Sequence, residues 1–172
     1  MKELVRIPSV STDPEHVNDL KLAAMWIAEK LRSIGLKNVS IYPTPLHSIV
    51  YGELLTIPEG APTVLIYGHY DVQPAEPLDK WSSDPFAPEL RGENLYGRGA
   101  SDMKGQILAC IFAIESIISQ TKLPVNVKFL IEGEEEIGSP NLSAFIKQHA
   151  DMLACDFALN TDTGMLAPDT PT

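Results

Sequence analysis

Residues 63–71, TVLIYGHYD, decide the fold of this chain. The first five of them, Thr63–Tyr67, form a continuous apolar and β-branched run, which is typical of a strand buried on both faces. Similar runs follow at Val125–Ile131 and Phe157–Asn160, and a strongly apolar helix is expected at Gly105–Ile118, between the first run and the second. Strands that alternate with helices predict an α/β fold, a three-layer αβα sandwich with a mixed, largely parallel sheet.

An amphipathic helix is expected ahead of the first buried strand. Asp13-Pro14 provides a capping side chain and a residue suited to the first turn, and apolar residues then recur at three- and four-residue steps as far as Gly35. The remaining predicted elements are the end of a helix before Pro8, strands at Val39–Tyr42 and Ser48–Leu55, and a short helix at Asn141–His149.

The composition is that of an ordinary globular protein. The chain has 172 residues, of which 44% are hydrophobic and 21% charged, and this excludes disordered and collagenous classes. The length suits one domain. The net charge of −10 argues against binding to nucleic acid or to an anionic membrane surface. The excess carboxylates are therefore either solvated or used to hold cations.

The sequence also predicts a cytoplasmic protein. Cys110 and Cys155 form neither a CxxC motif nor a disulfide scaffold, which favours a reducing compartment. The residues after Met1 lack the apolar core of a signal peptide. The longest apolar stretch, Ile107–Ile118, contains Glu115 and is too short to cross a bilayer.

Acidic side chains and one histidine follow the buried strands. His69 and Asp71 follow the first, the run Glu134-Glu135-Glu136 follows the second, and Asp162 follows the third, while Asp102 ends a Gly-rich loop before the apolar helix. Ligand sites of α/β sheets form outside the carboxyl ends of the strands. Carboxylates gathered there repel one another unless a cation neutralises them. A histidine among carboxylates suits zinc, manganese or cobalt.

The spacing of these residues indicates that neighbouring side chains can have different roles in a metal site. Residues two apart on an extended chain face the same side, so one of His69 and Asp71 can bind a metal while the other orients that ligand by accepting its remaining N–H. Adjacent glutamates point in different directions, so one can bind metal while its neighbour takes a proton from water. Plainer interpretations stay open: a turn aspartate beside a satisfied histidine, a solvated acidic face, and Asp102 and Asp162 as helix-capping and turn-forming residues.

Two other kinds of site are excluded. The loop Gly97–Asp102 ends in aspartate where a dinucleotide-binding loop needs glycine. Ser101 is not in a GxSxG nucleophile elbow because position 103 is methionine. No role is assigned to His16, His47 or His149.

Four segments together resemble the M20 family of metallopeptidases, which comprises dizinc aminoacylases, deacetylases and dipeptidases. The segments are YGHYDVQP at 67–74, WSSDPFAP at 81–88, LYGRGASDMKG at 95–105 and EGEEEIGS at 132–139, in the family's order and spacing. The first two are most similar to the dipeptidase branch, which includes the carnosinase-like enzymes. Met103 is closer to the deacetylase and desuccinylase branches.

The resemblance implies a zinc-exopeptidase-like fold with two divalent ions, zinc first and manganese or cobalt as alternatives. It also implies a hydrolase that cleaves amide bonds in dipeptides or N-acyl amino acids. By position, His69 and Asp162 would bind the first metal and Glu136 would bind the second. Asp102 would bind both metals, and the peptide bond after Asp102 would be cis. Asp71 would orient His69, and Glu135 would be the general base.

Family members are longer than this chain and carry a lid domain for dimerisation and substrate capture, followed by a further catalytic segment with a histidine for the second metal. We therefore expect residues 1–172 to form a single, partial catalytic domain that stops before the lid, with little activity alone. The longer form would be a homodimer through the lid. An alternative from another class is a non-catalytic module that binds a metal or a partner through its exposed edge.

Overall fold

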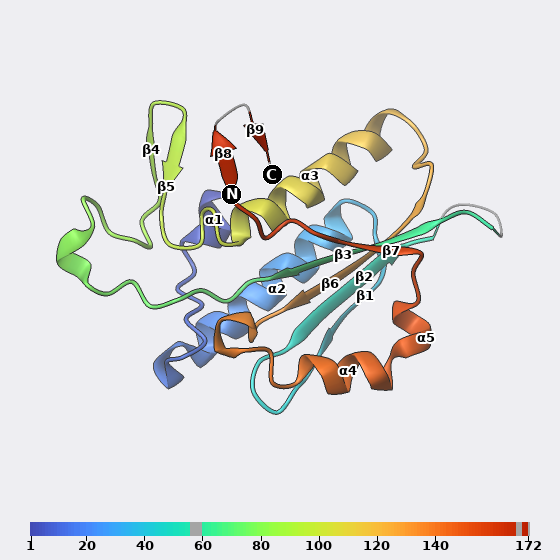
Figure 1. Cartoon of the computed structure of the whole chain (residues 1–172), viewed down its shortest axis with the longest axis horizontal. Coiled ribbons are helices and arrows are strands. Elements are labelled where there is room, and N and C mark those ends of the chain that lie inside the picture. The colour runs from blue at the N-terminus through green and yellow to red at the C-terminus, as the bar shows by residue number, and fades with distance from the viewer. Residues whose placement is uncertain (56–59, 168–169, 172) are drawn as a thin grey trace.

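A five-stranded mixed sheet lies between two layers of helices in the computed structural model, which describes residues 1–55, 60–167 and 170–171 (Figure 1). The strands are β1 Lys37–Tyr42, β2 Ile49–Leu54, β3 Thr63–His69, β4 Glu89–Arg91, β5 Asn94–Tyr96, β6 Asn126–Glu132, β7 Phe157–Asn160, β8 Met165–Ala167 and β9 Thr170–Pro171. The helices are α1 Lys2–Val5, α2 Val17–Ser33, α3 Lys104–Gln120, α4 Leu142–Gln148 and α5 Ala150–Leu153, with 3₁₀ turns at Pro14–His16, Leu78–Lys80 and Glu135–Ile137.

The strand order of the main sheet is β1-β2-β6-β3-β7. Strand β3 pairs in parallel with β6 and β7, whereas β2 runs antiparallel to β1 and β6. The parallel register places His69 beside Glu132 and Tyr67 beside Asn160, so the carboxyl ends of β3, β6 and β7 meet at one edge of the sheet. The predicted α/β class and the mixed sheet are thereby confirmed.

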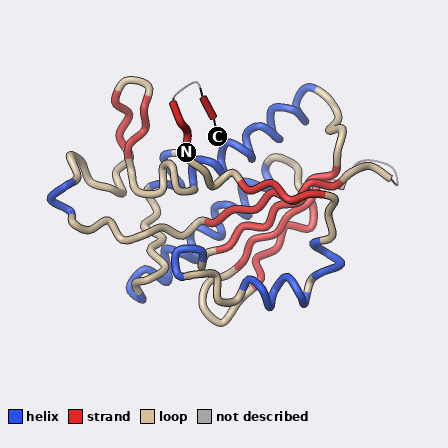
Figure 2. The backbone as a smooth tube through the Cα atoms, viewed as in Figure 1, coloured by secondary structure: helices blue, strands red, loops and turns tan. Residues whose placement is uncertain are grey.

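Alternation along the strands builds a core on each face of the sheet. Val50, Ile66 and Phe129 point into the cluster formed with α2 and α3. Their chain neighbours point to the other face, where they pack with side chains of α4 and α5; this second cluster consists of Ile49, Tyr51, Leu65, Leu130, Phe145 and Leu153. Each fully buried side chain of this size stabilises the fold by about 1.5–3 kcal/mol. The helix layers therefore fix the sheet edge on which the acidic residues lie (Figure 2).

Helices at the positions of α1 and α4 were predicted, but several other short elements were not. The β4–β5 hairpin has a two-residue loop that begins with Gly92 at φ +60°, and its Leu90 is 58% exposed, so it lacks the alternating pattern of a core strand. Helix α5 was also missed. No element was expected at the end of the chain, but β8 pairs there with β9. Residues 168, 169 and 172 of that end lie outside the described residues.

Candidate metal centre

His69, the last residue of β3, has a fully buried side chain. Its Nδ1 lies 3.0 Å from the backbone oxygen of Asp71 and 3.3 Å from Oδ1 of the same residue. Both of these atoms are acceptors, so Nδ1 carries the hydrogen and donates it. The lone pair of Nε2 is then free to accept a proton or to bind a metal.

Three carboxylates face Nε2 of His69. It lies 3.2 Å from Asp102 Oδ1, 3.4 Å from Asp162 Oδ2 and 3.8 Å from Glu135 Oε2. Nε2 is buried and has no hydrogen-bond partner within the described part of the chain. A lone pair facing carboxylate oxygens is unfavourable unless a proton or a metal ion lies between them.

The geometry of the donor atoms fits a metal ion. His69, Asp102 and Glu136 each offer one ligand atom, and these three atoms lie within 4.8 Å of one another. A neutral imidazole with several carboxylates is a donor set suited to zinc, manganese or cobalt. The unpartnered Nε2 of His69 and this donor set therefore fit a divalent ion.

Asp71 connects the end of β3 to the acidic turn, by which we mean residues 134–137. Its side chain is fully buried. Oδ1 accepts the backbone N–H of Glu135 at 3.2 Å, and Oδ2 accepts that of Glu136 at 3.0 Å. One carboxylate thus contacts the imidazole and also fixes the backbone of both glutamates.

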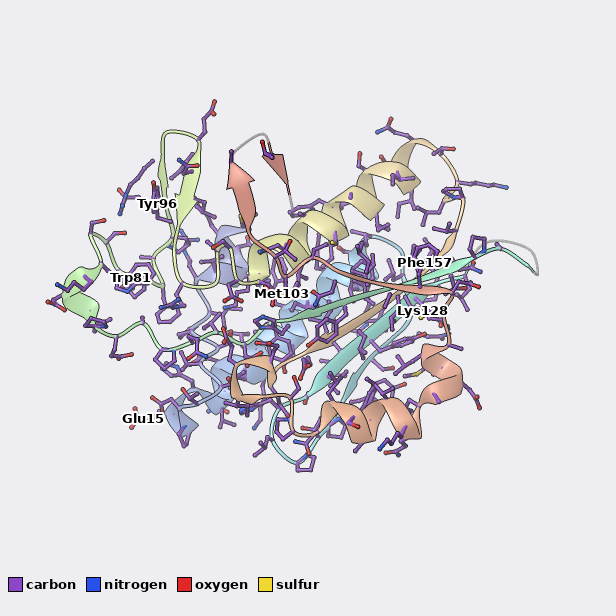
Figure 3. The ribbon with its side chains drawn as sticks, viewed as in Figure 1. Glu15, Trp81, Tyr96, Met103, Lys128 and Phe157 are labelled. Atoms are coloured by element: carbon purple, nitrogen blue, oxygen red, sulfur yellow. The ribbon has the colours of Figure 1, made fainter. Side chains whose placement is uncertain are left out.

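Asp102 and Asp162 come from two other segments, and Glu136 comes from the acidic turn. Asp102 directly precedes Met103, which Figure 3 labels at the start of α3, and the Asp102–Met103 peptide bond is cis as expected. Asp162 follows β7, where its backbone N–H donates to Asn160 Oδ1 at 3.0 Å. Oε2 of Glu136 accepts from the side-chain amide of Gln73 at 2.7 Å. The structure therefore brings all six residues together: His69, Asp71, Asp102, Glu135, Glu136 and Asp162.

The clustered carboxylates change the acid–base properties of the centre. Burial alone would lower the pKa of His69, but the hydrogen bond and charge of Asp71, with the charges of Glu135 and Asp162, outweigh it and raise the pKa to about 9. Burial, together with the charges of Asp102 and Asp71, raises the pKa of Glu136. The pKa of His69 rises because negative charges without compensating cations surround the imidazole, whereas burial is the first cause of the rise in the pKa of Glu136.

Two other glutamates at the end of β6 do not face the centre. Glu132 accepts from the hydroxyls of Tyr67 at 2.7 Å and Ser139 at 2.8 Å. Glu134 accepts from the Thr44 hydroxyl, from the backbone N–H of His47 at 2.9 Å and from the Asn141 side chain at 2.8 Å. Thr44 and His47 lie 90 and 87 positions away in sequence, so the local pattern alone does not separate Glu134 from its two neighbours. The contact of Gln73 with Glu136 was not predicted either.

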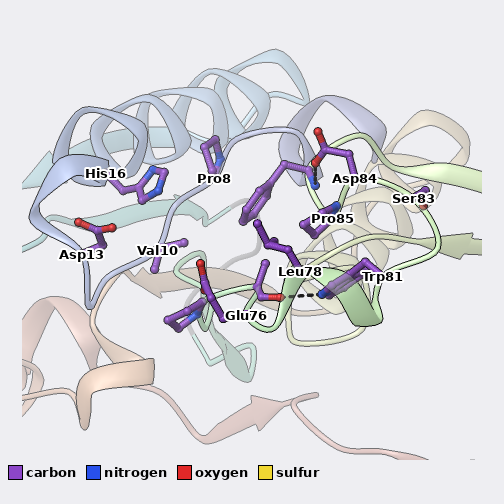
Figure 4. A pocket seen from close by; sticks show the side chains of 13 residues that line it. Pro8, Val10, Asp13, His16, Glu76, Leu78, Trp81, Ser83, Asp84 and Pro85 are labelled. Carbon is purple, nitrogen blue, oxygen red and sulfur yellow. Dashed lines mark hydrogen bonds between the residues drawn. The ribbon is translucent and has the colours of Figure 1, made fainter.

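Two cavities lie near this edge of the sheet. One of about 680 Å³ has Asp102 and Asp162 in its wall, so it opens onto the centre. The other, about 580 Å³ and shown in Figure 4, lies between segments 8–16 and 74–86. None of the six centre residues, all of which are described, lines that second cavity. Trp81 forms part of its wall, with its indole N–H donating to the Ala75 carbonyl at 2.7 Å.

Among the helices of the described residues, none has the length and apolar character needed to span a membrane.

Comparisons with known proteins agree on one family. The model of peptidase family M20/M25/M40 matches residues 65–171. The chain is 40% identical to the Beta-Ala-His dipeptidase of Mus musculus over 164 residues, which cover 88% of this chain and 33% of the mouse protein. It is 31% identical to the cysteinylglycine-S-conjugate dipeptidase of Corynebacterium striatum over 173 residues, which cover 100% of this chain and 38% of the bacterial protein. The crystal structure of human carnosine dipeptidase 1 matches with a TM-score of 0.87 at 34% identity, covering 94% of this chain and 37% of that one.

The chain spans about a third of the length of the curated relatives it matches. The match to the family model nevertheless takes in more than half of the chain and includes all six residues of the centre. This chain belongs to peptidase family M20/M25/M40.

Proposed function

We propose that this chain is the part of a metallopeptidase catalytic domain that holds a dinuclear metal centre and hydrolyses amide bonds in dipeptides or N-acyl amino acids. The observation that carries the proposal is the buried, unpartnered Nε2 of His69 facing the carboxylates of Asp102, Asp162 and Glu135 within the described residues. The names of the relatives, dipeptidases for β-alanyl-histidine and for cysteinylglycine conjugates, support the substrate class.

The residues of the centre divide into two groups of metal ligands. His69 and Asp162 would hold the first ion and Glu136 the second, while Asp102 would contact both. Zinc is the first expectation, with manganese or cobalt as alternatives, because these ions share the same donor preferences. When bound, the ions would polarise the scissile carbonyl and lower the pKa of the attacking water.

Glu135 is the general base of the proposed reaction. Its side chain is 39% exposed beside the centre, and its carboxylate accepts no hydrogen bond from any described residue. Its backbone is held by Asp71, so the carboxylate is positioned yet free to take a proton from water and to pass it to the leaving amine. Asp71 keeps the Nε2 lone pair of His69 directed at the ions by accepting from its Nδ1–H.

We further propose that a substrate-capturing lid, the dimer contact and a histidine for the second ion lie outside residues 1–172. The alternative function is a non-catalytic metal- or partner-binding module. That alternative is favoured by the apolar side chains on the edge strand β7, where Phe157 is 52% and Leu159 42% exposed.

The test combines metal analysis with hydrolysis by the product of the complete reading frame. With zinc, manganese or cobalt supplied, we expect release of free amino acids from β-alanyl-histidine, cysteinylglycine or an N-acetyl amino acid. Glu135→Ala should lower turnover by about 10²–10⁴-fold and leave the metal content unchanged. Turnover close to that of the unaltered protein in Glu135→Ala would reject Glu135 as the base. Bound metal without hydrolysis of any of these substrates would favour the binding module.

A further inference from the structure

The segment that follows β3 contacts the acidic turn through three alternating residues. His69, Asp71 and Gln73 are two apart, and Tyr70 and Val72 between them are fully buried. Residues spaced by two on an extended chain project to the same side. His69 faces the Glu135 carboxylate, Asp71 accepts the backbone N–H groups of the turn, and Gln73 reaches the side chain of Glu136.

Gln73 contacts Glu136 through its side-chain amide. Nε2 donates to Oε2 of Glu136 at 2.7 Å and lies 3.4 Å from the backbone oxygen of the same residue. A hydrogen bond from an amide to a carboxylate is charge-assisted and stronger than one between neutral groups. Oε1 of Glu136 accepts no hydrogen bond within the described ranges, so one oxygen of this carboxylate is held while the other remains available.

We infer that Gln73 is a positioning residue of the metal centre, whose amide holds Glu136 so that a single carboxylate oxygen is presented to the cation. The inference rests on the proposed function, because it requires Glu136 to be a metal ligand. Glu136 belongs to the group whose ligand atoms converge within 4.8 Å, so rotation of its carboxylate would disturb that convergence. Groups that orient metal ligands in this way typically contribute 10–100-fold to metal affinity.

The location of Gln73 argues against a role in folding alone. Its side chain is exposed and lies outside the two core clusters. Its amide hydrogen bonds go only to Glu136 in the described part of the chain. Removing the amide should therefore change how Glu136 is held and leave the free energy of unfolding of the metal-free protein nearly unchanged.

The experiment compares Gln73→Met with Gln148→Met. Methionine keeps the length of glutamine but has no N–H donor. Gln148, the last residue of α4, is exposed and makes no side-chain hydrogen bond to a described residue, so it is a matched control. We expect Gln73→Met to weaken Co²⁺ and Zn²⁺ binding about tenfold, measured by calorimetry, and Gln148→Met to leave it unchanged. The visible absorption spectrum of bound Co²⁺, which reports ligand number and geometry, should change in Gln73→Met alone.

Two outcomes would overturn the inference, and they can be told apart. If the unaltered protein binds these ions and Gln73→Met shows the same affinity and the same Co²⁺ spectrum, Gln73 does not position Glu136, and the proposed metal centre is unaffected. If the unaltered protein binds neither ion, the proposed centre fails, and the role of Gln73 fails with it.

Discussion

Two neighbouring regions of the molecule contain glutamates with different partners. The inner region is Glu134 with the residues that donate hydrogen bonds to it, and the rim is His69 with the carboxylates that face it. Glu134, 1% exposed, accepts hydrogen bonds from Thr44, His47 and Asn141. Glu135, the next residue, accepts none from the described residues and faces His69. A carboxylate surrounded by neutral donors needs no cation, whereas one that faces other carboxylates does.

The difference follows from the direction in which each side chain leaves the turn. Gly133 has no side chain, and a Cβ there would overlap the ring of Tyr70, so the backbone lies against this buried residue. From that position Glu134 points inward, and Glu135 and Glu136 point towards the candidate metal centre. The acidic run thus has one carboxylate held by hydrogen bonds and two that face the candidate centre.

Replacing His69 should have the largest effect on the rim. His69→Ala removes the only nitrogen donor among the three converging ligand atoms found in the described residues, so the affinity for Zn²⁺ should fall by about 100-fold or more. Calorimetric titration of the metal-free protein measures this loss. His16→Ala is the control, since His16 pairs with Asp19 outside the centre. Zn²⁺ affinity close to that of the unaltered protein in His69→Ala would show that the rim does not bind metal through this imidazole.

Replacing Glu134 should have the largest effect on the inner region. Glu134→Ala leaves the donors of Thr44, His47 and Asn141 without their acceptor, so the free energy of unfolding should fall by about 3 kcal/mol. Urea denaturation of the metal-free protein measures the change. A loss below about 1 kcal/mol would mean that water replaces the carboxylate easily, and that the inner region is less closed than its burial indicates.

The sequence predicted the main strands and the location of the candidate centre, but it did not predict the role of each glutamate. The buried runs at 63–67 and 125–131 predicted strands that became β3 and β6, because continuous apolar runs have few alternatives in a chain of this composition. The rule that sites lie at the carboxyl ends of parallel strands predicted that His69 and the acidic run would meet. Which glutamate does what could not be read from adjacent, identical residues without the resemblance to a family.

What the sequence missed depended on distant partners or on weak local signals. The inward position of Glu134 is set by Thr44 and His47, which lie 90 and 87 positions away, and the contact from Gln73 to Glu136 joins residues 63 positions apart. The β4–β5 hairpin has an exposed Leu90 and no core-facing pattern, so only its turn could have indicated it. Hydrophobic periodicity indicates which residues are buried, but it does not predict polar contacts between residues far apart in sequence.

The pH dependence of metal binding should distinguish the rim from the inner region. Because surrounding carboxylates raise the pKa of His69 to about 9, Nε2 carries a proton at neutral pH in the metal-free protein, and an ion must displace it. Apparent affinity should therefore rise about tenfold per pH unit as the pH increases towards 9. Calorimetry in buffers of different ionisation enthalpy should show release of about one proton for each first-site ion. Affinity that does not vary between about pH 6 and 8 would contradict the protonated state of His69.

The smallest effect is expected for Glu135→Ala on the stability of the metal-free protein. Its carboxylate accepts no hydrogen bond from the described residues, and its attraction to a protonated His69 is offset by repulsion from Asp102 and Asp162 nearby. The free energy of unfolding should therefore change by less than about 0.5 kcal/mol, while Glu134→Ala under the same conditions shows its large loss. A loss in Glu135→Ala as large as that in Glu134→Ala would mean that both glutamates serve folding. The distinction between an inner carboxylate that stabilises the fold and an outer one left free for proton transfer would then be wrong.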